Sequence, residues 1–393
     1  MESSNSQPNT EELKINEKKD EVMDYEKDEL KEKGKAEEQQ FVKLFDAVLQ
    51  QNRGNLSDGD IAEGVAASVS FFREDISSAC AREKYNTPKI LSGFFHRYSP
   101  LYAGKTRRII VYALLGCEKL RFCFHRPSLK IVDVGSGAGS ALVGLYSALY
   151  EGGFPFQSLE VTAVDYNKNW EIFFNAIVKK LCEDNFGYAS RLFKEKEINC
   201  SFVCFDAFKD GCEKETCLNE ADIIFMKGVV SILRNDDDRY KIMRDVASAM
   251  EPGSLLVYIE SPTYVKYFER ENSLSLVFQT TTVLPTSSVS QSPDVPFADC
   301  QSPLDSNLNT QASSFSSEDR IFTSPSPWIE SQTYNPVLQV SGSASHHIEK
   351  NNQIMLRPDT DNRFNFSAPG VSEYGQGFAS ISNQEIFILE KKH

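Results

Sequence analysis

The sequence lacks the features that would place it in a membrane or in a secreted, disulfide-bonded scaffold. Its longest apolar runs, such as residues 109–115, fall far short of the roughly 20 residues that a membrane-spanning helix needs. The polar, charged N-terminal segment shows no secretory signal. Nine cysteines cannot all pair, and several lie in apolar stretches. We therefore expect reduced thiols and a soluble protein of the cytoplasm or nucleus, without a membrane partner.

The sequence also lacks an excess of basic residues. Lysine and arginine number 42 against 56 aspartate and glutamate, which gives a formal net charge of -14. An acidic chain argues against sequence-independent binding to nucleic acid, because such binding needs cations to displace phosphate counterions. The clearest basic run is Lys105, Arg107 and Arg108. We interpret that run as a solvated helix face rather than a basic groove.

Changes of composition along the chain predict five segments. Residues 1–38 are rich in charge and poor in apolar anchors, so we expect a disordered tail there, with an exposed helix over 11–40 as the alternative. The tail and a Ser-rich insertion further on are the segments that could bind protein partners. The remaining segments are a helical cap or lid (39–126), a nucleotide-binding α/β domain (127–284), a disordered Ser-, Pro- and Gln-rich insertion (285–353) and C-terminal strands that complete the sheet (354–393).

Helix signals are clear within the cap. Asp58 or Asp60 could cap the helix that follows them. Pro88 is typical of a first helical turn, with Thr87 before it as N-cap. A further helix is expected over 103–122, from its apolar spacing.

Strands and helices then alternate. This order predicts an α/β fold: a Rossmann-like, mostly parallel sheet with helices on both faces, carrying the helical cap before it. The chain ends in an apolar run, and we expect 378–382 and 385–389 to form antiparallel closing strands. The expected strands are 130–134, 160–164, 199–205, 221–226, 254–259 and 273–284, and the expected helices are 141–150, 170–181, 237–250 and 264–270.

A glycine-rich turn follows the first of these strands directly and precedes a helix. Asp133 opens it, and Gly135, Gly137 and Gly139 follow at every second position. Glycines let the backbone turn tightly and approach a ligand, and the helix start offers amide donors. The dinucleotide fingerprint G-x-G-x-x-G/A requires Gly or Ala at its sixth place, which here is Ser140.

The pattern D-x-G-x-G-x-G instead resembles motif I of class I S-adenosylmethionine (SAM)-dependent methyltransferases. The resemblance covers about residues 130–260 and names no subfamily. It implies that SAM is the cofactor and that the loop, Ser136 included, passes close to its methionine part. Asp133 would then contact the ligand amine, or orient the loop by accepting backbone N–H bonds.

Acidic residues at the ends of the next two strands fit the same cofactor. Asp165 ends the second strand, where Rossmann-like folds hold ribose hydroxyls with a carboxylate. A cap on the next helix is the alternative. The resemblance places Asp206, with Ala207 after it, beside the adenine amino group, although a turn or helix-cap aspartate is nearly as good an interpretation. It also implies that Tyr166 packs on the adenine or ribose.

The acceptor of the methyl group is not readable from the sequence. The fourth strand ends in Lys227, which could orient an anion or act as a base, although a surface lysine is the simpler interpretation. The Asn/Asp-Pro-Pro-Tyr-like motif that family members use on amide or exocyclic nitrogens is missing there. We expect no metal site, and interpret Cys200 and Cys204 as core residues on one strand face.

The prediction is therefore a SAM-dependent methyltransferase with an unidentified acceptor. A non-catalytic, methyltransferase-like SAM-binding or scaffold protein is the alternative. An NAD-dependent oxidoreductase is a weaker one, because of Ser140.

Overall fold

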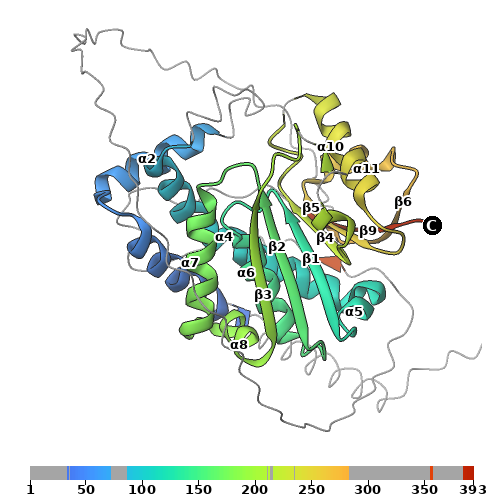
Figure 1. The fold of residues 1–393 in the computed structure, drawn as a ribbon, viewed down its shortest axis with the longest axis horizontal. Helices are drawn as coiled ribbons and strands as arrows, with labels where there is room; N and C mark the ends of the chain where they lie inside the picture. Colours follow the sequence, from blue (N-terminus) through green and yellow to red (C-terminus); the bar gives the residue numbers. More distant parts are fainter. Residues whose placement is uncertain are drawn as a thin grey trace, which may run out of the picture. The chain divides into compact units, whose positions relative to one another are not determined.

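A seven-stranded sheet forms the centre of the protein (Figure 1), in the order β3-β2-β1-β4-β5-β9-β6. The computed structural model describes residues 33–34, 36–71, 86–209, 211–212, 216–233, 235–282, 355–356 and 384–393. Strands β1 to β5 pair in parallel, in the order of a doubly wound nucleotide-binding sheet. The predicted α/β fold is thus confirmed. The strands are β1 (Ser128–Val134), β2 (Ser158–Asp165), β3 (Glu197–Cys204), β4 (Ile223–Lys227), β5 (Leu255–Glu260), β6 (Leu274–Gln279) and β9 (Glu385–Lys391), while β7 (Thr281–Thr282) and β8 (Met355–Leu356) pair separately.

The C-terminal strand β9 lies inside the sheet and is its antiparallel member. It pairs with β5 on one side and with β6 on the other. Its apolar run from Ile386 to Leu389 is buried on both faces, which explains why a strand so near the C-terminus carries no polar alternation. The antiparallel closing strand was predicted, but its expected hairpin partner, 378–382, lies outside the described residues. The partners that the structure gives are β5 and β6.

Helices cover both faces of the sheet and form two separate cores. On one face, α4, α6, α7 and α8 pack against the odd-numbered side chains of β1, including Leu129 and Ile131. On the other face, α9, α10 and α11 pack against Val132 and Val134. None of the described helices is long and apolar enough to cross a membrane. The helices are α2 (Asp58–Phe71), α4 (Pro88–Gly116), α5 (Glu118–Cys123), α6 (Ser140–Glu151), α7 (Trp170–Glu183), α8 (Gly187–Glu195), α9 (Thr216–Asn219), α10 (Asp236–Ala249) and α11 (Lys266–Glu269), preceded by a helix over residues 36–52.

The helix starts differ in part from the prediction. Thr87 caps α4 as expected, since its side chain accepts a hydrogen bond from the Ile90 amide. Before α2, however, the cap is Ser57 and not an aspartate. The Ser57 hydroxyl accepts from the Asp60 amide (3.1 Å), while the Asp60 carboxylate accepts from the Ser57 amide (2.9 Å), which is a capping box.

The cap contains one long helix where two were expected. Helix α4 runs through Pro100 without ending and stops at Gly116, and α5 begins after the extended residue Cys117. A proline costs a helix one hydrogen bond, and close packing on α6 makes up for this cost. A Cβ atom at Gly144 of α6 would lie 2.2 Å from the Ala103 carbonyl oxygen, so the two backbones touch.

The basic run on α4 is not a solvated face, which corrects the sequence interpretation. The Arg107 guanidinium is buried and pairs with Glu151 of α6 at 2.5 Å. Arg108 pairs with Glu38 of the first helix at 2.6 Å. The first pair joins the cap to the sheet-covering helix α6, and the second joins two helices of the cap. Two of the three charges of this run are therefore engaged in ion pairs within the protein.

The contact between α4 and α6 leads to a stability prediction. Gly144→Ala places a methyl group against the Ala103 carbonyl and within 2.9 Å of the Arg107 amide nitrogen. We expect the free energy of unfolding in urea to fall by about 1–3 kcal/mol from this overpacking. Gly59→Ala in the first turn of α2 is the control, because its nearest neighbour lies 3.6 Å away. An unchanged stability of Gly144→Ala would contradict the close contact.

Candidate functional site

The glycine loop after β1 is held in a left-handed path. Gly135, Gly137 and Gly139 have φ angles of 71°, 54° and 76°, which L-residues with a side chain rarely adopt. The amides of Gly135 and Ser136 both donate to the Val164 carbonyl at the end of β2, at 2.8 and 3.1 Å. The loop is therefore tied to the neighbouring strand before α6 begins.

The three glycines face different surroundings. A Cβ atom at Gly135 would lie 2.7 Å from a methyl group of Val229, and one at Gly139 would lie 2.7 Å from the Phe174 ring. Both positions are closed by packing within the protein. A Cβ atom at Gly137 would meet nothing closer than the Trp170 indole, at 4.0 Å. Gly137 is thus the loop glycine that a ligand can approach.

Asp165 stands opposite Gly137 at the end of β2. Its Oδ2 accepts from the Gly137 amide (2.8 Å) and its Oδ1 from the Asn167 amide (2.9 Å). The residue is 7% exposed, and burial raises the pKa of its carboxyl to about 6. A carboxylate offers about four acceptor positions, so each oxygen keeps one for a neighbouring ligand hydroxyl. The position before α7 belongs to Asn169 and not to Asp165, contrary to the helix-cap interpretation.

Asp133 lies on β1 under α4 and is 1% exposed. Its Oδ2 has no hydrogen-bond partner among the described residues. Burial raises the pKa of this carboxyl well above its ordinary value, with a further contribution from the charge of Asp165. Within the described residues the loop amides donate to Val164, to Asp165 and, from Gly139, to the Ser136 carbonyl, and none donates to Asp133. The geometry therefore favours the ligand-facing interpretation of Asp133 over the loop-orienting one.

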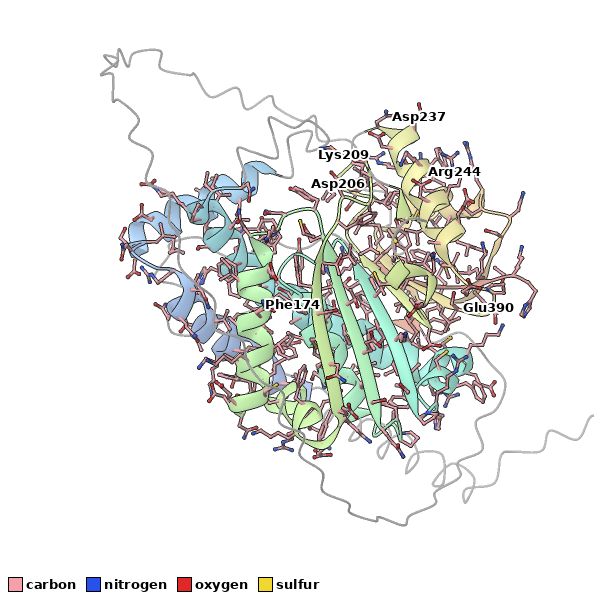
Figure 2. All side chains as sticks on the ribbon, in the orientation of Figure 1. Phe174, Asp206, Lys209, Asp237, Arg244 and Glu390 are labelled. Carbon is pink, nitrogen blue, oxygen red and sulfur yellow. The ribbon has the colours of Figure 1, made fainter. Side chains whose placement is uncertain are left out.

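The remaining predicted residues gather beyond the ends of β2 and β3. Asp206 accepts from the Phe208 amide at 3.2 Å, as a turn aspartate does, and lies 3.7 Å from the Lys209 ammonium. Figure 2 labels both of these charged side chains. Its charge helps to raise the pKa of Asp165, so the two carboxylates are neighbours. Tyr166 is half-buried beside β3, and Ala207 is buried in the second core. The structure thus brings the predicted loop and its acidic partners to one edge of the sheet.

Lys227 adjoins this edge at the end of β4. It is half-buried, and its ammonium lies 3.6 Å from the centre of the Tyr102 ring on α4. Burial, together with the charge of Lys105 on α4, lowers the pKa of Lys227 to about 7. The simpler interpretation as a surface lysine is therefore wrong. The Glu260 carboxylate, at the end of β5, acts in the opposite direction, because its negative charge raises the pKa of Lys227.

The cysteine interpretation needs one correction. Cys200 on β3 packs against the first core and lies 3.5 Å from the Tyr146 hydroxyl. Cys204 is exposed at the strand end, where its thiol donates to the Tyr166 carbonyl at 3.5 Å. The two thiols therefore do not share one buried environment.

Sequence reasoning did not assign a role to Trp170, Lys105 or Glu260. Glu260 had a usable signal, because it ends a buried strand next to the one that Lys227 ends. Trp170 and Lys105 had none, since only the crossing of α4 and α7 over the sheet brings them to the site.

Solved methyltransferase structures of several kinds resemble part of this chain. No family model matches the chain, and no curated protein matches it. The mitomycin 7-O-methyltransferase MmcR is 18% identical over 56% of this chain, with a TM-score of 0.30, and the match spans 63% of MmcR. The N-methyltransferase NodS from Bradyrhizobium japonicum, in complex with S-adenosylhomocysteine, is 12% identical over 42% of this chain and 74% of NodS, with a TM-score of 0.25. Human N-acetylserotonin methyltransferase, in complex with SAM, is 17% identical over 55% of this chain and 52% of its own, with a TM-score of 0.31. The likeness concerns the fold, and the acceptors in these names belong to those proteins.

The surroundings of the loop glycines lead to a second prediction. Gly137→Ala and Gly139→Ala both force a side chain into left-handed backbone, at a cost of about 1–2 kcal/mol. Gly139→Ala also drives its methyl group into Phe174, so we expect it to lose about 1–3 kcal/mol more. Urea unfolding without ligand measures both. Equal losses of unfolding free energy in the two variants would show that the loop does not pack as described.

Proposed function

We propose that this protein is a SAM-dependent methyltransferase, with its cofactor along the carboxyl edges of β1, β2 and β3. The observation that carries this proposal is the open approach at Gly137, directly beside the buried Asp165 carboxylate. Ligands of doubly wound sheets bind at this edge. When bound, SAM supplies a methyl group activated on a sulfonium ion, so the protein has to align the acceptor and exclude water.

The residues present fit this cofactor. The free acceptor positions of Asp165 suit the two ribose hydroxyls, which lie on adjacent carbons. The unpartnered Oδ2 of Asp133 suits the ammonium of the methionine part. Asp206 and Tyr166 lie where the adenine would extend, with Ala207 behind them. Gly135, Ser136 and Gly139 shape the turn between these groups.

Charge favours SAM over a dinucleotide at this loop. Asp133, Asp165 and Asp206 place three carboxylates around it. Besides burial, the charge of Asp165 raises the pKa of Asp133, and the charge of Asp206 raises the pKa of Asp165. Such a site attracts a sulfonium cation, whereas it would repel the two negative charges of a pyrophosphate. The sixth position, Ser140, also departs from the dinucleotide fingerprint.

Calorimetry with SAM, S-adenosylhomocysteine and NAD tests the cofactor. We expect SAM and S-adenosylhomocysteine to bind and NAD not to bind. Gly137→Val blocks the approach and Asp165→Ala removes the ribose acceptor, so each should weaken SAM binding at least tenfold, while Lys179→Met on the exposed side of α7 serves as a control. Failure of both cofactor forms to bind would end the proposal. Binding without transfer of labelled methyl to any fraction of a cell extract would favour the non-catalytic alternative.

The pH dependence of SAM binding provides an independent test. The ionised carboxylate is the form that accepts ribose hydroxyls, and the pKa of Asp165 is raised to about 6. Affinity should therefore be constant above about pH 7 and fall by up to tenfold per unit below about pH 6. Asp133, whose pKa burial also raises, acts in the same direction. A SAM affinity that stays flat between pH 5 and 8 would contradict the role of both carboxylates.

A further inference from the structure

Lys227 ends β4, the strand beside β1, and therefore lies near the glycine loop that follows β1. Val229, two residues further on, packs against Gly135 of the loop. The carboxyl end of β4 therefore touches the turn that would hold the methionine part of SAM. The lysine side chain points to the same face as Asp133, because the register pairs Asp133 with Phe225, two residues before Lys227.

The charged groups around Lys227 come from three elements. Lys105 faces it from α4, Glu260 from β5 and Asp133 from β1. The Glu260 carboxylate accepts the amides of Ser231 (3.2 Å) and Ser261 (3.1 Å), which hold it in place. Among the described residues, Lys227 forms no ion pair with any of these carboxylates. Burial lowers the pKa of Lys105 to about 8 and that of Lys227 to about 7, so much of the Lys227 amine is neutral at physiological pH.

A row of aromatic rings connects the cofactor loop to this lysine. Trp170 lies beside Gly137, and its ring centre is 5.8 Å from that of Phe94. Phe94 lies 4.7 Å from Tyr98, and Tyr98 stacks on Tyr102 at 5.8 Å. Tyr102 presents its face to Lys227. Rings of α4 and α7 thus form a continuous row from Gly137 to Lys227, and flat rings of this kind suit a flat aromatic ligand.

We propose that Lys227 is the general base of methyl transfer and that the acceptor is a flat aromatic compound carrying a hydroxyl group. This inference rests on the proposed function. The hydroxyl oxygen forms a bond to the methyl carbon, the carbon–sulfur bond breaks and its electron pair stays on sulfur, and the hydroxyl proton passes to the neutral Lys227 amine. The new ammonium is stabilised by the face of Tyr102 and by the Glu260 carboxylate. It later releases the proton to water.

The chemistry of the neighbours favours a hydroxyl over other nucleophiles. An amine attacks with its own lone pair and needs no base beforehand. A carboxylate is already ionised and would prefer permanently charged lysines to half-neutral ones. A hydroxyl on an aromatic ring must lose its proton to become a strong nucleophile, and a base that titrates near neutral pH is matched to that task.

Competitive acetylation of the protein across pH 5–10, read by mass spectrometry at Lys227, tests the amine without an acceptor. We expect the acetylation of Lys227 to be half-maximal near pH 7, whereas the midpoint at Lys179 should be that of an ordinary lysine. Lys105→Met removes a neighbouring positive charge and should move the midpoint up, while Glu260→Gln should move it down. If the acetylation midpoint of Lys227 equals that of an ordinary lysine and neither variant changes it, the proposal is overturned, even if SAM binds.

Three probes with one ring system test the acceptor: 2-naphthol, 2-naphthylamine and 2-naphthoic acid, each with labelled SAM. We expect label on the naphthol alone. Lys227→Met and Lys227→Arg should lower its kcat/KM by about 10²–10⁴-fold while SAM affinity changes less than twofold, because arginine cannot accept the proton. With 4-nitrophenol, which is already ionised at pH 8, the loss should be under tenfold. Three outcomes would each reject the base role: labelled methyl on the amine or the acid instead, no labelled methyl on any probe, or equal losses of kcat/KM with both phenols. A failure of SAM itself to bind would reject the proposed function on which this inference rests.

Discussion

The hydrogen bond from the Gly137 amide to the Asp165 carboxylate is the contact on which the site depends. Together with the two amides that donate to Val164, it fixes the glycine loop against the end of β2. Without it, the Gly137 amide would have no partner on the neighbouring strand, and the loop would be tied to β2 by the two amides before Gly137 alone. The same atom pair thus shapes the loop and positions the group that suits a ribose. One buried acid serves the fold and the ligand together.

That arrangement carries a cost in the empty protein. Burial raises the pKa of Asp165 from an ordinary 3.8 to about 6, which means that the folded state binds its proton more tightly than the unfolded state. The unfolding free energy from this group is therefore greatest below pH 4 and falls as the pH rises to about 6, by about 3 kcal/mol at 1.4 kcal/mol per unit. The Oδ2 of Asp133 adds a buried acceptor that has no partner among the residues the structure describes. A cationic ligand would stabilise both carboxylates. Without such a ligand, these two groups lower the stability of the folded protein at neutral pH.

The strands of the parallel sheet could be predicted closely from the sequence, whereas the helical cap could not. The first two strands are apolar runs followed or ended by the glycine loop and by Asp165, and Asp206 follows the third strand closely. Local pattern was therefore enough to place Asp133, Asp165 and Asp206 at one edge of the parallel sheet. The cap depends on contacts between distant residues. Pro100 would end most helices, and the contact of α4 with Gly144 that offsets it is not visible in local spacing. For the same reason the buried pair of Arg107 and Glu151 looked like surface charge.

Helix α4 therefore contributes groups to the site that the sheet does not supply. Phe94, Tyr98, Tyr102 and Lys105 recur at intervals of three and four residues, so they share one helix face, and that face lies over the ends of β1 and β4. Had the helix ended at Pro100, Tyr102 and Lys105 would have no fixed place beside Lys227. The sheet supplies a carboxylate edge common to many nucleotide-binding folds, whereas the rings and the second lysine come from a helix outside it. Under the proposed function, specificity for an acceptor would depend on how α4 crosses the sheet, and it could change while the glycine loop stays the same.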